Sequence, residues 1–143
     1  MTQVEFHTGV ADTVHFACRL LRKAHRQQAS VLVTAPATTL DALDRQLWTF
    51  APHEFVPHCR IDRGGAAMQR LSPIWLSESC PPLPHPDIVV NIGSDMPDAP
   101  TDFSRVIEVL ATDPDAAQAG RARWRAYVAL GLSIEHHTAG AAS

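Results

Sequence analysis

The chain has 143 residues, of which 45% are apolar and 19% are charged, and its net charge is −3 with the eight histidines counted as neutral. This composition is typical of one soluble globular domain and excludes a disordered chain or a fibrous repeat. The negative balance argues against a surface that attracts nucleic-acid phosphates broadly. Because neither a basic leader nor a run of about eighteen apolar residues occurs, we expect a cytoplasmic protein without membrane contact.

The first fifty residues predict two strand–helix units. The opening strand alternates apolar and polar residues, and Thr8-Gly9 is expected to end it. A cap at Asp12 or Thr13 then starts a helix. The β-branched run that follows is typical of a strand buried on both faces of a parallel sheet. The expected elements are a strand at 4–6, a helix from 13 to about 27, a strand at 30–35 and a helix from 36–39 to Phe50.

The second half continues this alternation. Three further strands are expected at 74–76, 87–92 and 105–110. A last helix is expected to begin at Asp113-Pro114 and to stop at Gly131. Strand–helix–strand crossovers imply parallel, right-handed units. We therefore predict a single α/β domain over 1–137, a mostly parallel open sheet flanked by helices, Rossmann-like without a nucleotide site, with a flexible tail at 138–143.

Motifs for catalysis, nucleotide binding or metal binding are not evident. The loops after the first two strands lack the closely spaced glycines and the lysine of a phosphate-binding loop. The three cysteines, at 18, 59 and 80, form no C-x-x-C pair. Adjacent strand residues His58-Cys59 point to opposite faces, and His136-His137 are interpreted as exposed tail residues. We expect no catalytic residue, no metal and no cofactor.

An aromatic segment around two prolines is the first candidate binding surface. Trp48 ends a predicted helix, and a loop then brings Phe55-Val56-Pro57-His58. Aromatic side chains on a loop give a large contact area at low entropic cost and often anchor interfaces. The alternative is that Trp48 and Phe55 close one end of the core.

One face of the last predicted helix is the second candidate. Arg121, Trp124, Arg125 and Val128 are three or four residues apart, so cations and an apolar ring share one face. Such a face suits a peptide that is both acidic and apolar. The alternatives are a solvated basic stripe with Trp124 half-buried against the sheet, or direct binding of single-stranded nucleic acid.

These segments together resemble the chi subunit family of bacterial DNA polymerase III. The matching motifs are the Leu-Trp that ends segment 40–48, Phe-Val-Pro-His at 55–58, segments 73–76 and 87–91, and Arg-x-Arg-aromatic-x-x-Tyr at 121–127. The resemblance implies a non-catalytic protein that pairs with the psi subunit and through it reaches the clamp loader. It also implies binding of the acidic C-terminal tail of single-stranded-DNA-binding protein, so that DNA is contacted only indirectly.

The resemblance also assigns residues to the two surfaces. It implies a psi-binding set of Trp48, Phe55, Val56, Pro57 and His58. It implies a tail-binding set of Arg121, Trp124, Arg125, Val128, Gly131 and Arg105. Ala117 stands where relatives carry a lysine, and Arg123, Arg125 or Arg105 are candidates to compensate. The rival functions are a nucleotide-binding α/β enzyme and a direct single-stranded nucleic-acid binder.

Overall fold

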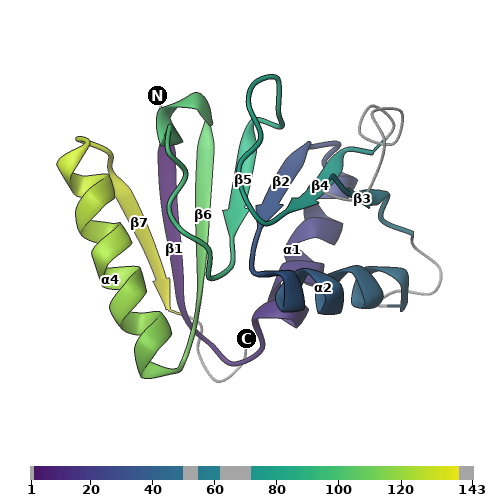
Figure 1. Cartoon of the computed structure of the whole chain (residues 1–143), viewed down its shortest axis with the longest axis horizontal. Coiled ribbons are helices and arrows are strands. Elements are labelled where there is room, and N and C mark those ends of the chain that lie inside the picture. Colours follow the sequence, from purple (N-terminus) through teal and green to yellow (C-terminus); the bar gives the residue numbers. More distant parts are fainter. Residues whose placement is uncertain (1, 50–54, 62–71, 139–143) are drawn as a thin grey trace.

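One parallel sheet organises the molecule (Figure 1). The computed structural model describes residues 2–49, 55–61 and 72–138, and these residues form seven strands in the order β3-β4-β2-β5-β6-β1-β7, each parallel to its neighbours. The elements in chain order are β1 (Gln3–Val10), α1 (Thr13–Arg26), β2 (Val31–Thr34), α2 (Ala37–Thr49), β3 (His58–Arg60), β4 (Ile74–Ser77), β5 (Ile88–Asn91), η1 (Pro100–Asp102), β6 (Arg105–Ala111), α4 (Pro114–Ala129) and β7 (Ile134–Thr138). The predicted open α/β sheet is confirmed.

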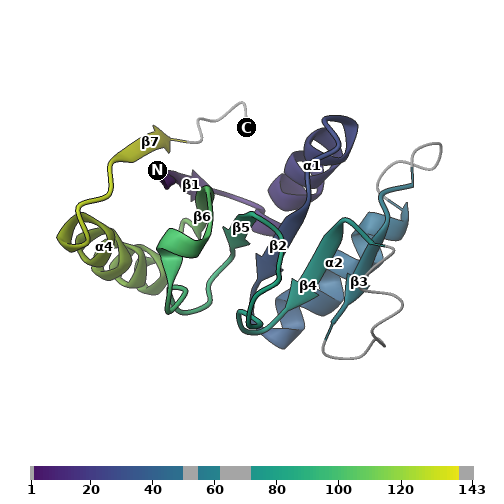
Figure 2. The same cartoon turned by 90° about the horizontal axis from the view of Figure 1, so that it is seen from above.

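Apolar side chains pack on both faces of this sheet. On one face, α1 and α2 cover a core that includes Val31, Val33 and Ile107. On the other face, α4 covers a second core built around Phe6, Leu32 and Tyr127 (Figure 2). Successive strand residues point to opposite faces, which is why Val31 and Leu32 belong to different cores.

The helix ends follow the expected capping chemistry. The Asp12 carboxylate accepts a hydrogen bond from the His15 N–H at 3.0 Å, which confirms one of the two proposed caps of α1. Asp113 likewise accepts from the Ala116 N–H at 3.4 Å. Gly131 follows α4 with a φ of 78°, in the left-handed region that stops helices. Within the described part of the chain, no helix is long and apolar enough to cross a lipid bilayer.

The first strand is longer than predicted. We expected Thr8-Gly9 to end it, but β1 continues to Val10. Gly9 has a φ of 68°, and the pairing with β6 shifts register between His7 and Val10. A glycine at such an irregularity bends the strand without ending it.

Two strands were not predicted. β3 has only three residues, and β7 includes His136-His137, which we interpreted as tail residues. The interpretation of His136-His137 as tail residues was therefore wrong, and Thr138, the first residue of the expected tail, still pairs with Thr8. β7 is an edge strand with little burial, so it lacks the apolar pattern that reveals a strand. Phe50, residues 51–54 and the rest of the expected tail, 139–143, lie outside the described residues.

Candidate partner-binding surfaces

A groove of about 640 Å³ lies between the first half of α4 and the strands β1, β6 and β7. Its walls are mostly apolar, and charge is contributed at the lip by α4. Its lining includes Thr8, Leu110, Gly120, Arg121, Trp124, Arg125 and His136. Phe6 of β1 also lines it, so the groove reaches the core beneath α4.

Gly120 allows α4 to lie close to the sheet. A Cβ atom at this position would stand 1.8 Å from Cδ2 of Leu110 on β6, far closer than atoms can approach. Glycine is therefore favoured by the close approach and not by a special φ angle, because a larger residue would have to displace the end of the Leu110 side chain. Because Gly120 and Leu110 both line the groove, this contact also sets how deep the groove is.

Trp124 forms one side of the groove and is half-buried. Its ring packs edge-on against Phe6, with centroids 4.9 Å apart, and against His136 of β7, with centroids 5.6 Å apart. The Thr8 hydroxyl and His136 Nε2 are hydrogen-bonded at 2.8 Å behind it. Trp124 is therefore half-buried against the sheet, as one of the alternatives predicted. Its ring nevertheless also lines the open groove.

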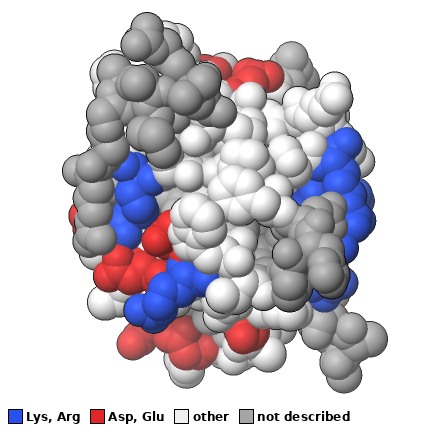
Figure 3. Space-filling view, turned by 90° about the vertical axis from the view of Figure 1, so that its right-hand side faces the viewer, with Lys and Arg blue, Asp and Glu red and all other residues white. Residues whose placement is uncertain are grey.

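The aromatic segment forms a second exposed surface beside β3. Trp48 is 60% exposed and Phe55 is 51% exposed, and their rings pack together with centroids 5.0 Å apart. Neither ring closes the core. Figure 3 views the side of the molecule on which α2, β3 and β4 lie, where a broad uncharged area separates charged groups. We call the pair Trp48 and Phe55 the aromatic patch.

The neighbours of the aromatic patch are structural supports. Val56 is buried, and His58 is buried beside both rings of the patch. The His58 ring is held by two hydrogen bonds, from Nδ1 to the Val56 carbonyl at 2.7 Å and from Nε2 to Asp44 at 2.9 Å. Pro57 is partly exposed. Of the predicted psi-binding set, Trp48, Phe55 and Pro57 can therefore be touched by a partner, whereas Val56 and His58 position them.

Comparison with known proteins decides the family. The family model described as "DNA polymerase III chi subunit, HolC" matches residues 1–135. This chain belongs to the chi subunit family. It is 32% identical to DNA polymerase III subunit chi of Pseudomonas aeruginosa, with 96% of each chain covered. It is 30% identical to that of Haemophilus influenzae over 76% of this chain and 75% of the relative.

The relative in Escherichia coli K12, also a DNA polymerase III subunit chi, is 25% identical over 91% of this chain and 88% of its own. The resemblance read from the sequence is thereby confirmed, and membership makes the chain an accessory subunit of DNA polymerase III in DNA replication. Binding to the psi subunit and binding to single-stranded-DNA-binding protein remain predictions.

The arginines of α4 in this chi-family chain differ in where their side chains lie. Arg121 and Arg125 are exposed and line the groove, as does Ala117. Arg123 points instead into the molecule, where its Nε donates to Glu108 at 2.8 Å. Of the three arginines named as candidates to compensate, Arg125 is the one that lines the groove together with Ala117.

Arg105 lies on the other face of the sheet. Its side chain shares a face with Ile107 and Val109, beneath α1, and makes two hydrogen bonds to the Glu5 carboxylate at 2.9 and 3.0 Å. The structure does not bring Arg105 together with the groove. Val128 and Gly131 lie further along α4 and after its end, both exposed, and do not line the groove.

A buried polar network under α4 was missed by sequence reasoning. Glu108 of β6 is fully buried and accepts hydrogen bonds from Arg123, from the Tyr127 hydroxyl at 2.7 Å and from the Asn91 amide at 3.1 Å. Burial raises the pKa of Glu108, while the Arg123 guanidinium and these hydrogen bonds act in the opposite direction. A lone glutamate within an apolar strand was the available signal. The network anchors α4 to β6 directly beneath the groove.

Proposed function

We propose that this protein is a non-catalytic bridging subunit in the cytoplasm. In this proposal the groove binds the acidic, apolar C-terminal tail of single-stranded-DNA-binding protein. The aromatic patch binds the psi subunit, which joins the protein to the clamp loader. The observation that carries the proposal is an apolar groove in which half-buried Trp124 stands between exposed Arg121 and Arg125.

The chemistry of the groove suits such a tail. A chain terminus that ends in an apolar residue needs a cation for its carboxylate and an apolar slot for its side chain. Arginine can hold a carboxylate with two parallel N–H donors, and Arg121 offers this geometry one turn before Trp124. Arg125 adds positive charge for acidic residues further back in the tail. The ring of Trp124 and the side chain of Leu110 supply the apolar walls.

The aromatic patch suits a protein partner. Large exposed aromatic side chains that are held in place lose little entropy on binding and commonly act as interface anchors. His58 and Val56 hold this pair from below, so the patch is preorganised. DNA is then reached only through the two partner proteins.

The decisive experiment uses Arg121→Ala and a peptide that copies the acidic tail. We expect the peptide affinity to fall by roughly ten- to a hundredfold, since a charge-assisted bidentate contact contributes about 1.5–3 kcal/mol. Raising the salt concentration should weaken binding to the parent protein more than binding to the variant. Fluorescence anisotropy with a labelled peptide measures both effects.

Arg19→Ala is the matched control, because it removes an exposed arginine of α1, on the opposite face of the sheet. Equal losses in the two variants would mean that only net charge matters, and the groove would not be the tail site. The isolated protein should also leave a single-stranded oligonucleotide unbound at low salt. Micromolar binding of that oligonucleotide would contradict a purely bridging role.

A further inference from the structure

Four side chains that can bind metal ions lie next to one another on β1 and β7, the last two strands at one edge of the sheet. β1 and β7 are paired in parallel with Glu5 opposite Glu135 and His7 opposite His137. Residues two apart on a strand, and residues opposite one another on paired strands, point to the same face. Two carboxylates and two imidazoles are thereby gathered on the face away from α4. The earlier expectation of no metal site considered only His58-Cys59 and His136-His137.

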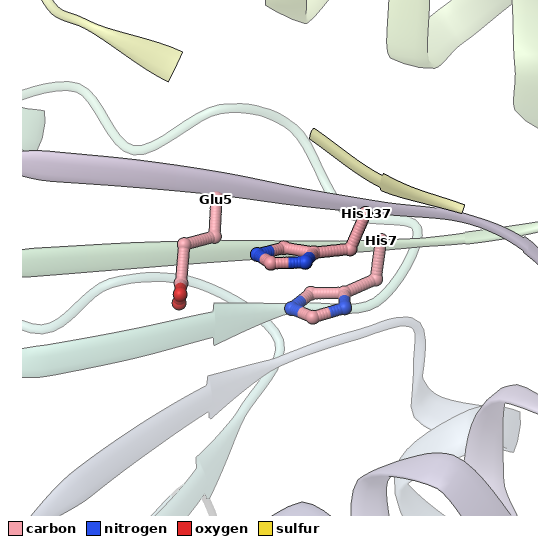
Figure 4. Close-up of side chains that lie close together, drawn as sticks. All are labelled: Glu5, His7 and His137. Carbon is pink, nitrogen blue, oxygen red and sulfur yellow. The ribbon is translucent and has the colours of Figure 1, made fainter. Parts of the chain in front are cut away.

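Three of the four side chains lie within reach of a single ion. One ligand atom from each of Glu5, His7 and His137 lies within 4.8 Å of the others. The rings of His7 and His137 are stacked, with centroids 4.8 Å apart and an interplanar angle of 12°, and Glu5 points to the same side (Figure 4). Ligands with bonds of about 2.0–2.1 Å in a tetrahedral zinc site stand roughly 3.4 Å apart. Binding of one ion would require rotation about χ2, which is soft in histidine, so that a nitrogen lone pair of each ring points at the ion.

The surroundings supply the outer partners of such a site. Arg105 holds both oxygens of Glu5 by hydrogen bonds and orients the carboxylate, whose remaining lone pairs stay available. Glu135 lies 3.0 Å from Nε2 of His137, so a second carboxylate contacts the ligand set. Phe16 of α1 packs against the His7 ring, with centroids 5.1 Å apart. Hydrogen-bonded carboxylates around ligating histidines are the usual outer shell of protein metal sites.

We propose that Glu5, His7 and His137 bind one divalent transition-metal ion of the Zn²⁺ type, with Glu135 as a neighbouring carboxylate. Two imidazoles and one carboxylate favour Zn²⁺, Co²⁺ or Ni²⁺ over Mg²⁺ and Ca²⁺, which prefer all-oxygen ligands. The ion would fasten β7 to β1. His136, the next residue of β7, faces the groove, so the metal site and the groove wall lie on opposite sides of one strand.

Titration of the full, tag-free chain with ZnCl₂ in a calorimeter tests the proposal. We expect saturable binding of one Zn²⁺ per chain, and no binding of Mg²⁺ under the same conditions. His7→Gln and His137→Gln should each lower the affinity for Zn²⁺ by about tenfold or more. His136→Gln is the matched control, because it removes the adjacent histidine of the same strand from the opposite face and should leave the Zn²⁺ affinity unchanged.

A second measurement does not depend on the variants folding. In the nuclear magnetic resonance spectrum of the parent protein, Zn²⁺ should shift the ring signals of His7 and His137 and leave those of His15 and His25 in place. The proposal is overturned by absence of saturable binding, by equal loss in His136→Gln, by retained affinity in folded His7→Gln, or by ring shifts at other histidines.

Discussion

The buried carboxylate of Glu108 joins β6 to α4 through hydrogen bonds from Arg123 and Tyr127. Its charge is opposed by Arg123, whose side chain is only 11% exposed, and both partners lie between α4 and β6. Removing one partner of a buried ion pair leaves the other charge without compensation, which costs far more than the pair contributes when intact.

We therefore expect Arg123→Met to lower the free energy of unfolding at pH 7 by about 3–5 kcal/mol, measured by urea denaturation. Without the guanidinium, the pKa of Glu108 should rise further above its unfolded value. A raised carboxyl pKa penalises the folded state above that pKa and not below it, so the deficit should shrink as the pH falls toward 5. A loss below about 1 kcal/mol, or a deficit that grows on acidification, would contradict this account.

The contact between α4 and β6 governs the groove at the scale of elements. Gly120→Ala should improve helix propensity by about 0.5–1 kcal/mol, but the added methyl group must displace Leu110 at a cost of about 1–3 kcal/mol. We expect a net loss of about 0–2.5 kcal/mol of stability. Because Leu110 lines the groove, its displacement should lower the affinity for the tail peptide.

Ala119→Gly is the control for this substitution, since it changes helix propensity at an exposed neighbouring position and leaves the groove untouched. Thermal melts and peptide titration of both variants separate the two effects. Tail affinity that follows stability alone, and falls equally in Ala119→Gly, would show that Gly120 does not shape the groove.

Elements with a strong local pattern were predictable from the sequence. The buried central strands are rich in β-branched residues. Helices α1 and α4 begin at caps whose side chains accept hydrogen bonds from the first turn, as at Asp12 and Asp113. β7 was not predictable, because an edge strand with little burial and with charged or histidine side chains lacks that pattern. Its pairing with β1 is decided by contacts between residues about 130 positions apart.

The same distinction holds for the candidate site. Helical spacing correctly placed Arg121, Trp124 and Arg125 on one face of α4. Strand alternation puts Arg105 on the face of Ile107, but which face α4 covers is a tertiary fact that spacing does not contain. The roles of Arg123 and Glu108 likewise depend on two elements meeting, so the inward direction of Arg123 could not be read from the helix alone.

The two proposed surfaces stand at opposite edges of the whole molecule. Phe55 precedes β3 at one edge of the sheet, and the groove is completed by β7 at the other. Six strand spacings separate these edges, roughly 29 Å along the sheet. Side chains at such a separation act independently unless a shared element moves.

We expect Phe55→Ala to lower the affinity for the psi subunit by about thirtyfold or more and to leave the affinity for the tail peptide unchanged. Because Phe55 is about half exposed, stability should change by less than about 1 kcal/mol. Leu83→Ala, which truncates another exposed apolar side chain, should leave psi binding intact. Unchanged psi affinity in a folded Phe55→Ala protein would remove the aromatic patch from the interface.

The place of β1 in the sheet also affects the order in which the protein can fold on the ribosome. β1 is the first of the described strands to be synthesised, yet its two neighbours, β6 and β7, are the last two. The strands β3, β4, β2 and β5 can pair while the ribosome is still translating the chain. Strand β1 stays unpaired on both edges until β6 and β7 have been synthesised. The groove, whose walls come from β1, β6, α4 and β7, therefore forms last, and a chain released early cannot form it.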